Sequence, residues 1–200
     1  MQTNEDKSRL CALAACVINI IGHLWYIWKN LDGTANPNIS SWLVFSFIGL
    51  LNLSSYRKIT GDWVKSVFPL VNTIFLLILL ALIMRHGSFK TLGRTDLSCL
   101  ILGTGAGLLW WIFKKKEFAP TLVQIILEVS MIIGFIPTIV LASRNPMNES
   151  PVGWILWDIS FFLQILVVRY ASEGKYVEYL FPVNRTFLNS IVVVCLIYNK

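Results

Sequence analysis

The chain is divided into seven long apolar segments, and this pattern limits its fold more than any other feature. Each segment is close to the ~20 residues that an α-helix needs to cross a hydrocarbon core about 30 Å thick. The segments are residues 10–28, 40–56, 63–84, 97–113, 119–142, 151–170 and 176–198. Hydrophobic residues make up 56% of the chain and charged residues 14%, which leaves too little polar surface for a soluble domain. We therefore predict an all-α membrane protein with seven transmembrane helices.

The net charge of +6 comes from basic residues that lie mainly in the short loops between the apolar segments. A nucleic-acid-binding protein would instead gather them on one face. The loops on the N-terminal side hold more Lys and Arg than the loops on the other side, so the positive-inside rule predicts a cytoplasmic N-terminus. We expect a multi-pass protein of the cell membrane (inner or plasma membrane), surrounded by the lipid bilayer and without a nucleic-acid partner.

An internal repeat relates the two halves of the chain. At an offset of 112 residues, the sequence SWLVF (41–45) aligns with GWILW (153–157). At an offset of 113 residues, GDWVKSVFPLVNT (61–73) aligns with GKYVEYLFPVNRT (174–186). Because these matches keep their order over several spans, with one residue of slip, they predict two copies of one three-helix unit.

The offset of 112 also aligns Asn36 with Asn148 and Asn52 with Gln164. The fourth apolar segment has no counterpart, which makes it a linker helix between the two units. The units lie four spans apart, so equivalent helices point the same way and are related by an axis along the membrane normal. The predicted divisions are residues 1–90 for the first three-helix bundle, 91–116 for the linker helix and 117–200 for the second three-helix bundle.

This arrangement of three, one and three helices resembles the SWEET and PQ-loop transporter superfamily. In that family the first helix of each repeat carries a proline, often followed by Gln or Thr, and GFIPTIV supplies Pro137 and Thr138 in the second half. Trp42 and Trp154, which follow the loop in each half, are also similar to the family pattern, whereas the full Pro-Gln dipeptide is absent. The nicotinamide riboside-type vitamin transporters have a similar architecture, but the chain lacks a recognisable form of their Trp-rich signature.

The resemblance implies transport of a small solute that contacts asparagines of the third helix in each half. Asn72 is the matching position in the first half, and Asn184 or Asn189 is the matching position in the second. An interhelical hydrogen bond, worth about 0.6 kcal/mol, is the alternative role for any one of these amides. We expect a transporter or facilitator for a small polar solute such as a sugar, vitamin, nucleoside or amino acid, working by alternating access.

Three ionisable residues, Glu128, Asp158 and Arg185, fall within the apolar segments of the second half. A charged side chain at mid-depth costs about 2.5–3.5 kcal/mol, so each requires a partner or a cavity. One interpretation is an ion pair between Arg185 and a carboxylate that only joins two helices. A second is a cluster that faces the solute or couples its movement to protons, and a third, which suits Asp158 best, is a side chain that extends to the membrane interface. The equivalent positions of the first half are uncharged, so we expect an asymmetric site.

Uncharged polar and aromatic residues complete the predicted site. Arg185 and Asn189 are four residues apart and share a helix face. Trp25 and Trp157 lie one turn deeper than the tryptophans at the segment ends, where they are candidates to pack against a ring or sugar face. The predicted solute-binding residues are Asn52, Asn72, Gln164, Asn184, Arg185, Asn189, Trp25 and Trp157.

Three prolines, Pro69, Pro137 and Pro182, interrupt the predicted helices. Each removes a backbone donor, frees a carbonyl and allows a bend. In a transporter these bends are candidate hinges, and in a static bundle they are tolerated kinks. We predict hinges at all three positions.

Two other function classes remain as alternatives: a seven-helix receptor or sensor, and an assembly protein without transport activity. A retinal-binding sensor is disfavoured because the last apolar segment contains no lysine for a Schiff base. An enzyme is disfavoured because the chain has two histidines and neither an H-E-x-x-H nor a G-x-S-x-G motif. The four cysteines lack C-x-x-C spacing. No catalytic site, metal or cofactor is predicted.

Overall fold

The computed structural model describes residues 3–37, 39–86, 94–113, 115–116, 118–171 and 175–199. Within these ranges the chain forms α-helices joined by short connections, with one 3-10 turn. The elements are α1 (Asn4–Leu31), α2 (Ile39–Thr60), α3 (Trp63–His86), α4 (Arg94–Phe113), α5 (Ala119–Arg144), η1 (Pro146–Asn148), α6 (Pro151–Tyr170) and α7 (Tyr176–Tyr198). The predicted boundary between the first bundle and the linker helix, at residues 90 and 91, lies outside the described residues.

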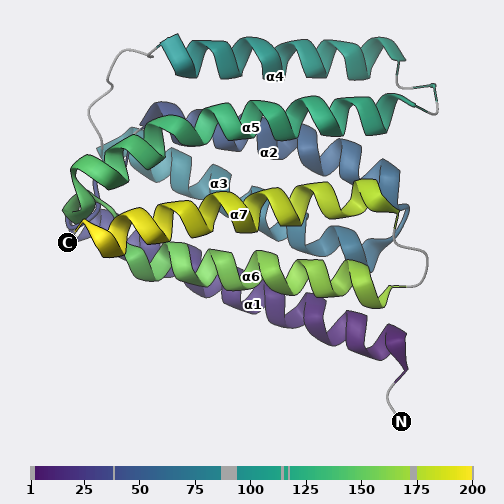
Figure 1. Cartoon of the computed structure of the whole chain (residues 1–200), viewed down its shortest axis with the longest axis horizontal. Coiled ribbons are helices and arrows are strands. Elements are labelled where there is room, and N and C mark those ends of the chain that lie inside the picture. The colour runs from purple at the N-terminus through teal and green to yellow at the C-terminus, as the bar shows by residue number, and fades with distance from the viewer. Residues whose placement is uncertain are drawn as a thin grey trace.

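Six of these helices form a closed ring. Around the ring α1 contacts α3, α3 contacts α2, α2 contacts α5, α5 contacts α7, α7 contacts α6, and α6 returns to α1. Helix α4 lies outside the ring, against α5 and α2 (Figure 1). The chain begins and ends at opposite ends of the bundle (Figure 1). We call the end that holds the start of α1, α3, α5 and α7 the N-terminal end, and the other end the C-terminal end.

The interior of the bundle contains both polar and apolar side chains, whereas its outer face is apolar, as α1 illustrates. Its buried residues recur every three or four positions and are mostly small or polar, so this face turns into the ring. They include Ser8, Ala12, Ala15, Asn19, Gly22, His23 and Tyr26. Its outward face carries large exposed apolar residues at the same spacing. They are Leu10, Leu13, Val17, Ile21, Leu24, Trp28 and Leu31. A helix with this pattern is stable when apolar solvent surrounds the bundle.

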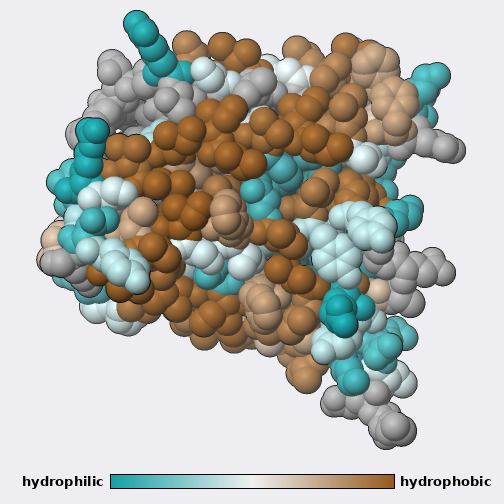
Figure 2. Space-filling view, viewed as in Figure 1, coloured by the Kyte–Doolittle hydropathy of each residue, from teal (hydrophilic) through white to brown (hydrophobic). Residues whose placement is uncertain are grey.

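The outer surface has the composition that a bilayer requires. In Figure 2 an apolar band covers the middle of the visible face, and hydrophilic residues gather at its two ends. Helices α1, α3, α5, α6 and α7 are each long and apolar enough to cross a membrane. The structure is therefore that of an all-helical, multi-pass membrane protein.

Seven spans are expected from the sequence, and five helices within the described residues are long and apolar enough to be spans, with α2 and α4 not among them. Helix α2 contains several serines and Asn52 and ends in the basic pair Arg57 and Lys58. Helix α4 begins with the charged sequence RTD. Both helices run for at least 20 residues, as α6 does.

Glycines allow α1 and α6 to pack closely, and this contact positions the tryptophans of the interior. A Cβ atom on Gly22 would lie 3.0 Å from the Trp157 ring, and a Cβ on Gly153 would lie 3.0 Å from the Tyr26 ring. The two aromatic rings thus occupy the space that the glycines leave on the facing helix. Small residues at such positions are the usual means by which membrane helices approach closely.

Candidate functional site

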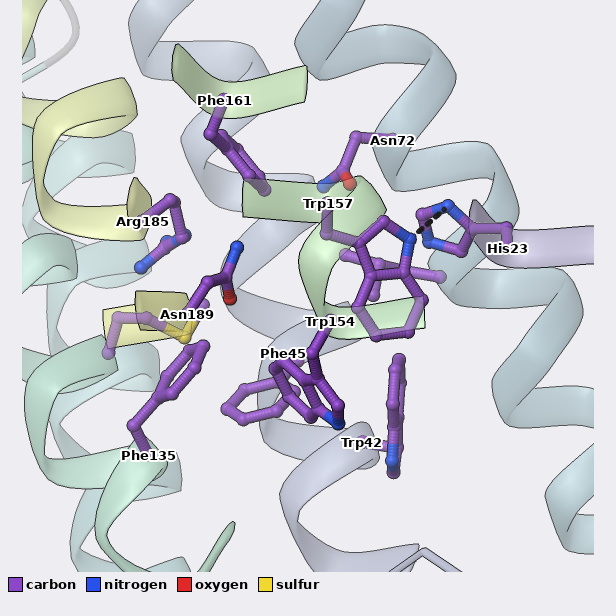
Figure 3. Close-up of a pocket in the computed structure, with 12 residues that line it drawn as sticks. His23, Trp42, Phe45, Asn72, Phe135, Trp154, Trp157, Phe161, Arg185 and Asn189 are labelled. Atoms are coloured by element: carbon purple, nitrogen blue, oxygen red, sulfur yellow. Dashed lines mark hydrogen bonds between the residues drawn. The ribbon is translucent and has the colours of Figure 1, made fainter. Parts of the chain in front are cut away.

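A cavity of about 50 Å3 lies in the centre of the ring, and all six ring helices contribute to its wall. Its polar lining consists of His23 from α1, Asn72 from α3, and Arg185 and Asn189 from α7. Its aromatic lining consists of Trp42, Phe45, Phe135, Trp154, Trp157 and Phe161. Arg185 and Asn189 face Trp157, Asn72 and His23 across this space (Figure 3). Four of the predicted solute-binding residues, Asn72, Trp157, Arg185 and Asn189, therefore meet at one cavity.

The charged partner of Arg185 is Glu128 on α5. Arg185 Nη1 lies 3.4 Å from Glu128 Oε2, and both side chains are almost fully buried. The Glu128 carboxylate also accepts hydrogen bonds from Asn184 Nδ2 at 2.7 Å and from Gln124 Nε2 at 2.8 Å. The third charged residue, Asp158, instead accepts a hydrogen bond from Ser190 Oγ at 2.9 Å. The predicted cluster of three charges is therefore a pair in the structure, with Asp158 separate from it.

Amide side chains extend the Glu128 site toward α2. Gln124 Nε2 also donates to Asn52 Oδ1 at 2.7 Å, and Gln124 Oε1 accepts from Ser55 Oγ at 2.9 Å. All of these groups are buried. Asn52 and Asn184 thus support the carboxylate and are not among the residues that line the cavity.

On the opposite wall, His23 joins a second polar network. Asn19 Nδ2 donates to Asn72 Oδ1 at 3.1 Å, while Trp157 Nε1 lies 3.0 Å and the Asn19 carbonyl oxygen 2.9 Å from His23 Nδ1. An indole N–H can only donate and a carbonyl can only accept, so Nδ1 satisfies one of them at a time. When Nδ1 accepts from Trp157, the ring proton resides on Nε2.

The N-terminal end of the ring is closed by an ion pair and a layer of aromatic rings. Lys65 Nζ lies 2.6 Å from Glu178 Oε2, and both side chains are buried. Beneath them the rings of Phe68 and Phe161 lie 5.0 Å apart and those of Phe161 and Phe181 lie 5.5 Å apart. This layer separates the cavity from that end of the bundle.

The C-terminal end is closed by tryptophans and a buried carboxyl. The rings of Trp42 and Trp154 lie 6.5 Å apart. Glu149, in the connection before α6, accepts hydrogen bonds from Tyr26 Oη at 2.7 Å and from Trp154 Nε1 at 2.9 Å. Burial raises the pKa of the Glu149 carboxyl to about 7, and the two hydrogen bonds oppose this rise. Its protonation state therefore changes near neutral pH.

Two of the three prolines have their freed carbonyls satisfied by side chains of other helices. Pro69 leaves the Lys65 carbonyl without its helical donor, and Gln164 Nε2 donates to that oxygen at 2.8 Å. Pro182 has the same effect on the Glu178 carbonyl, which accepts from Tyr56 Oη at 3.2 Å. Gln164, expected to bind solute, is thus a partner of the α3 backbone. Pro137 lies inside α5.

Trp25, also expected to line the cavity, lies away from it. Its ring packs against Trp28, and its Nε1 donates to Ser150 Oγ at 3.1 Å. The Lys65–Glu178 pair, Asn19 and Glu149 are not among the site residues expected from the sequence. The repeat does contain a signal for the ion pair, because Lys65 and Glu178 align at the offset of 113. Glu149 lies in a polar connection, and nothing in the local sequence indicates its burial.

Over the described ranges, no group of three or more His, Cys, Asp and Glu side chains is arranged to hold a metal ion. Comparison of the chain with protein-family models, with curated proteins and with solved structures gave no match. The function must therefore be argued from the geometry of the cavity.

Proposed function

We propose that the protein is a membrane transporter or facilitator for a small polar solute. The observation that carries this proposal is the central cavity, which is lined by side chains of all six ring helices and contains the buried Arg185. An arginine in the apolar interior of a membrane protein is costly and in general marks a pathway or a binding site. The resemblance to the SWEET and PQ-loop superfamily supports the same class of function.

We further propose that all seven helices cross the membrane, as two three-helix units, α1–α3 and α5–α7, with α4 as the linker. Contacts between repeat-equivalent residues support this arrangement, because only residues close to a two-fold axis can touch their own equivalents. Four aligned pairs are in contact. They are Asn36 N with Asn148 O at 2.9 Å, the rings of Trp42 and Trp154 at 6.5 Å, the rings of Phe68 and Phe181 at 6.5 Å, and Lys65 Nζ with Glu178 Oε2 at 2.6 Å.

These four contacts follow one another from the C-terminal end of the ring to its N-terminal end. An axis that passes through them runs along the bundle, in the direction that a parallel repeat requires. The repeat aligns Asn72 with Arg185, and both line the cavity between the two ends. The proposed solute site thus lies on the axis, where the two units meet.

Alternating access follows from closures at both ends of this axis. Opening the Lys65–Glu178 layer exposes the cavity at the N-terminal end, and opening the Trp42–Trp154 layer exposes it at the C-terminal end. Rocking of one unit against the other would open one layer while the other stays closed. Pro69 and Pro182 lie one turn from the Lys65–Glu178 pair, which suits them to act as hinges for the N-terminal opening, and Pro137 is the proposed hinge in α5.

The loop charges favour a cytoplasmic N-terminal end in the cell membrane. Reporter fusions at each end of the chain test this orientation. If a reporter fused to the N-terminus is active only outside the cell, the chain has the opposite orientation.

The test of transport uses the purified chain reconstituted into liposomes. Sugars, vitamins, nucleosides and amino acids are first screened by the rise in unfolding temperature that each produces. Uptake of the ligands that bind is then measured for the wild type, for Asn189→Ala and for the double variant Asn72→Ala with Arg185→Ala. Ser54→Ala serves as the control, because Ser54 is exposed and bonds only the backbone of its own helix.

We expect uptake that the cavity variants lose and the control retains. Unchanged uptake or stabilisation in the double variant would exclude this cavity as the site. A folded protein that binds a ligand but moves none across the bilayer would favour the receptor or sensor class. A folded protein without any ligand would favour the assembly class.

A further inference from the structure

The cavity wall contains buried hydrogen-bond donors that no described residue satisfies. They are Arg185 Nη1, Asn189 Nδ2 and, in the tautomer whose Nδ1 accepts from Trp157, the Nε2 atom of His23. The three residues are 5%, 3% and 1% exposed, and all three line the cavity. Donors are rarely buried without an acceptor, so the group that completes this site is expected to present oxygen lone pairs.

The Arg185 guanidinium is free to take a second partner. Its distance of 3.4 Å to Glu128 is long for a charge-assisted hydrogen bond, whereas Asn184 and Gln124 bind the same carboxylate at 2.7 and 2.8 Å. Glu128 therefore has close partners that do not depend on Arg185. The planar guanidinium presents two parallel N–H groups, a geometry that matches a carboxylate.

We propose that the cavity binds the carboxylate of a small monocarboxylic acid, with the Arg185 fork as the anchor and Asn189 and His23 as flanking donors. This inference rests on the transport function proposed above and names its substrate class. The aromatic rings of Trp154, Trp157 and Phe161 form the apolar part of the wall, where the hydrocarbon part of the acid would pack. The volume of about 50 Å3 limits the acid that fits this closed state to a few non-hydrogen atoms.

Charge balance adds a proton to the proposed binding step. The Arg185–Glu128 pair is neutral as a whole, so a bound carboxylate would leave one uncompensated negative charge inside the membrane, which is costly. A proton taken up by Glu128 removes that charge, and Arg185 then exchanges Glu128 for the solute. In this scheme one proton moves from solvent to Glu128 for each carboxylate bound, and the complex is neutral.

Other charged or titratable groups near α5 are already engaged or lie at its ends. Helix α7 presents Arg185 and, toward the N-terminal end, Glu178, which is paired with Lys65 of α3. Helix α2 presents Tyr56 and the terminal Arg57 and Lys58, and α4 begins with Arg94. Beyond these, Asp158 of α6 is bonded to Ser190, His23 of α1 lies across the cavity, and Glu149 follows η1. Glu149 titrates near neutral pH and therefore needs a control variant.

The experiment is calorimetric titration of the purified full-length chain in lipid nanodiscs, with acetate and propionate as probes. Acetamide and propionamide are the matched neutral probes, and chloride and inorganic phosphate are the alternative anions. Binding is measured between about pH 6 and pH 8, where the probes stay ionised, so uptake of one proton tightens binding about tenfold for each unit of decrease in pH. The variants are Arg185→Gln, Glu128→Gln and the control Glu149→Gln.

We expect carboxylates to bind and the amides to bind at least tenfold more weakly. Arg185→Gln should lose at least tenfold in affinity. Glu128→Gln should keep binding but lose its pH dependence, because residue 128 is then neutral at every pH, and Glu149→Gln should retain the wild-type slope. If Arg185→Gln does not fold, Asn189→Asp replaces it, since its carboxylate would repel the probe and reduce affinity to the same degree.

If the amides, chloride or phosphate bind as tightly as the carboxylates, the assignment to carboxylates is overturned. Carboxylate binding without pH dependence in the wild type would overturn the proton step. Failure of every carboxylate to bind, together with uptake of a neutral solute by the same preparation, would refute this inference while the transport function stands. If carboxylates bind but no solute is taken up, the transport function is refuted while the carboxylate site stands.

Discussion

Lys65 and Glu178 form a buried ion pair, with Nζ 2.6 Å from Oε2, and the two residues occupy equivalent positions of the internal repeat. A residue that lies on a two-fold axis meets its own equivalent. Two lysines or two glutamates would repel each other there, whereas one of each attracts. In the proposed arrangement of two repeated units, the difference between KSVFP and EYLFP therefore suits the contact between them.

Breaking this pair should destabilise the protein. Lys65→Met or Glu178→Gln leaves one buried charge without its partner, and we expect a loss of about 3–5 kcal/mol in the free energy of unfolding. The exchange of both residues, Lys65→Glu with Glu178→Lys, restores the pair and should recover most of this loss. Denaturant unfolding in detergent micelles measures all four proteins. If the exchange variant loses as much free energy of unfolding as the two single variants lose together, the residues do not interact.

The helices were more predictable from the sequence than the interior. Hydropathy located each helix to within several residues because lipid contact requires long apolar stretches. It missed the first turns of α1, which begins earlier because Thr3 and Asp6 form a capping box. It placed the start of the third segment at residue 63, where α3 begins, but it did not show that Lys65 in the first turn lies inside the ring.

The repeat predicted part of the site, because it aligned Asn72 with Arg185 and both face the cavity. It could not predict the position of Trp25, which depends on how α1 is rotated against the connection before α6. It also could not predict the burial of Glu149, which results from contacts with Tyr26 and Trp154 on two other elements. Such contacts over long sequence separations have no local pattern.

The hydrogen bond between Gln164 and the Lys65 carbonyl should matter only because of Pro69. Gln164→Leu removes the donor at 2.8 Å and leaves a buried carbonyl unsatisfied, at a cost of about 1–3 kcal/mol. Pro69→Ala returns a backbone N–H to the same oxygen, so the double variant should be more stable than Gln164→Leu alone. Unfolding in detergent tests this cycle. Strictly additive effects of the two substitutions would contradict the account.

Tyr56→Phe with Pro182→Ala forms the matched cycle in the second half, because Tyr56 Oη donates to the Glu178 carbonyl. Its longer distance of 3.2 Å predicts a smaller loss for the single tyrosine change than for Gln164→Leu. The same unfolding assay measures it. Coupling in one cycle and none in the other would show that the two prolines are not structurally equivalent.

Close packing of α1 on α6 should not tolerate a side chain at position 22. A Cβ atom there would lie 3.0 Å from the Trp157 ring and 3.1 Å from Leu156 Cβ, so Gly22→Ala should cost about 1–3 kcal/mol. Gly105→Ala is the control, because a Cβ atom at Gly105 meets no atom of the described residues within 4 Å. Thermal unfolding compares the two. Similar unfolding temperatures for both variants would refute the close contact.

Glu149 should make stability depend on pH. Its pKa rises from 4.5 to about 7 on folding, so the folded state binds more protons between these values, and stability falls as pH rises from about 4.5 to about 7. The full effect is about 3 kcal/mol, and it is absent in Glu149→Gln. The unfolding temperature of both proteins, measured from about pH 5 to pH 8, should show a steeper decline for the wild type. Parallel profiles would contradict the burial of an ionisable carboxyl at this position.

In the proposed mechanism, one cavity on the repeat axis opens alternately to the two sides of the membrane. Its most direct test is labelling of Asn189→Cys, with the native cysteines replaced by serine, by a membrane-impermeant maleimide added to either side of sealed vesicles. We expect little labelling in the closed protein. Labelling should occur from the N-terminal side when Lys65→Ala breaks one closure, and from the opposite side when Trp154→Ala breaks the other. Labelling from the same side in both variants, or equal labelling from both sides in each, would contradict the claim.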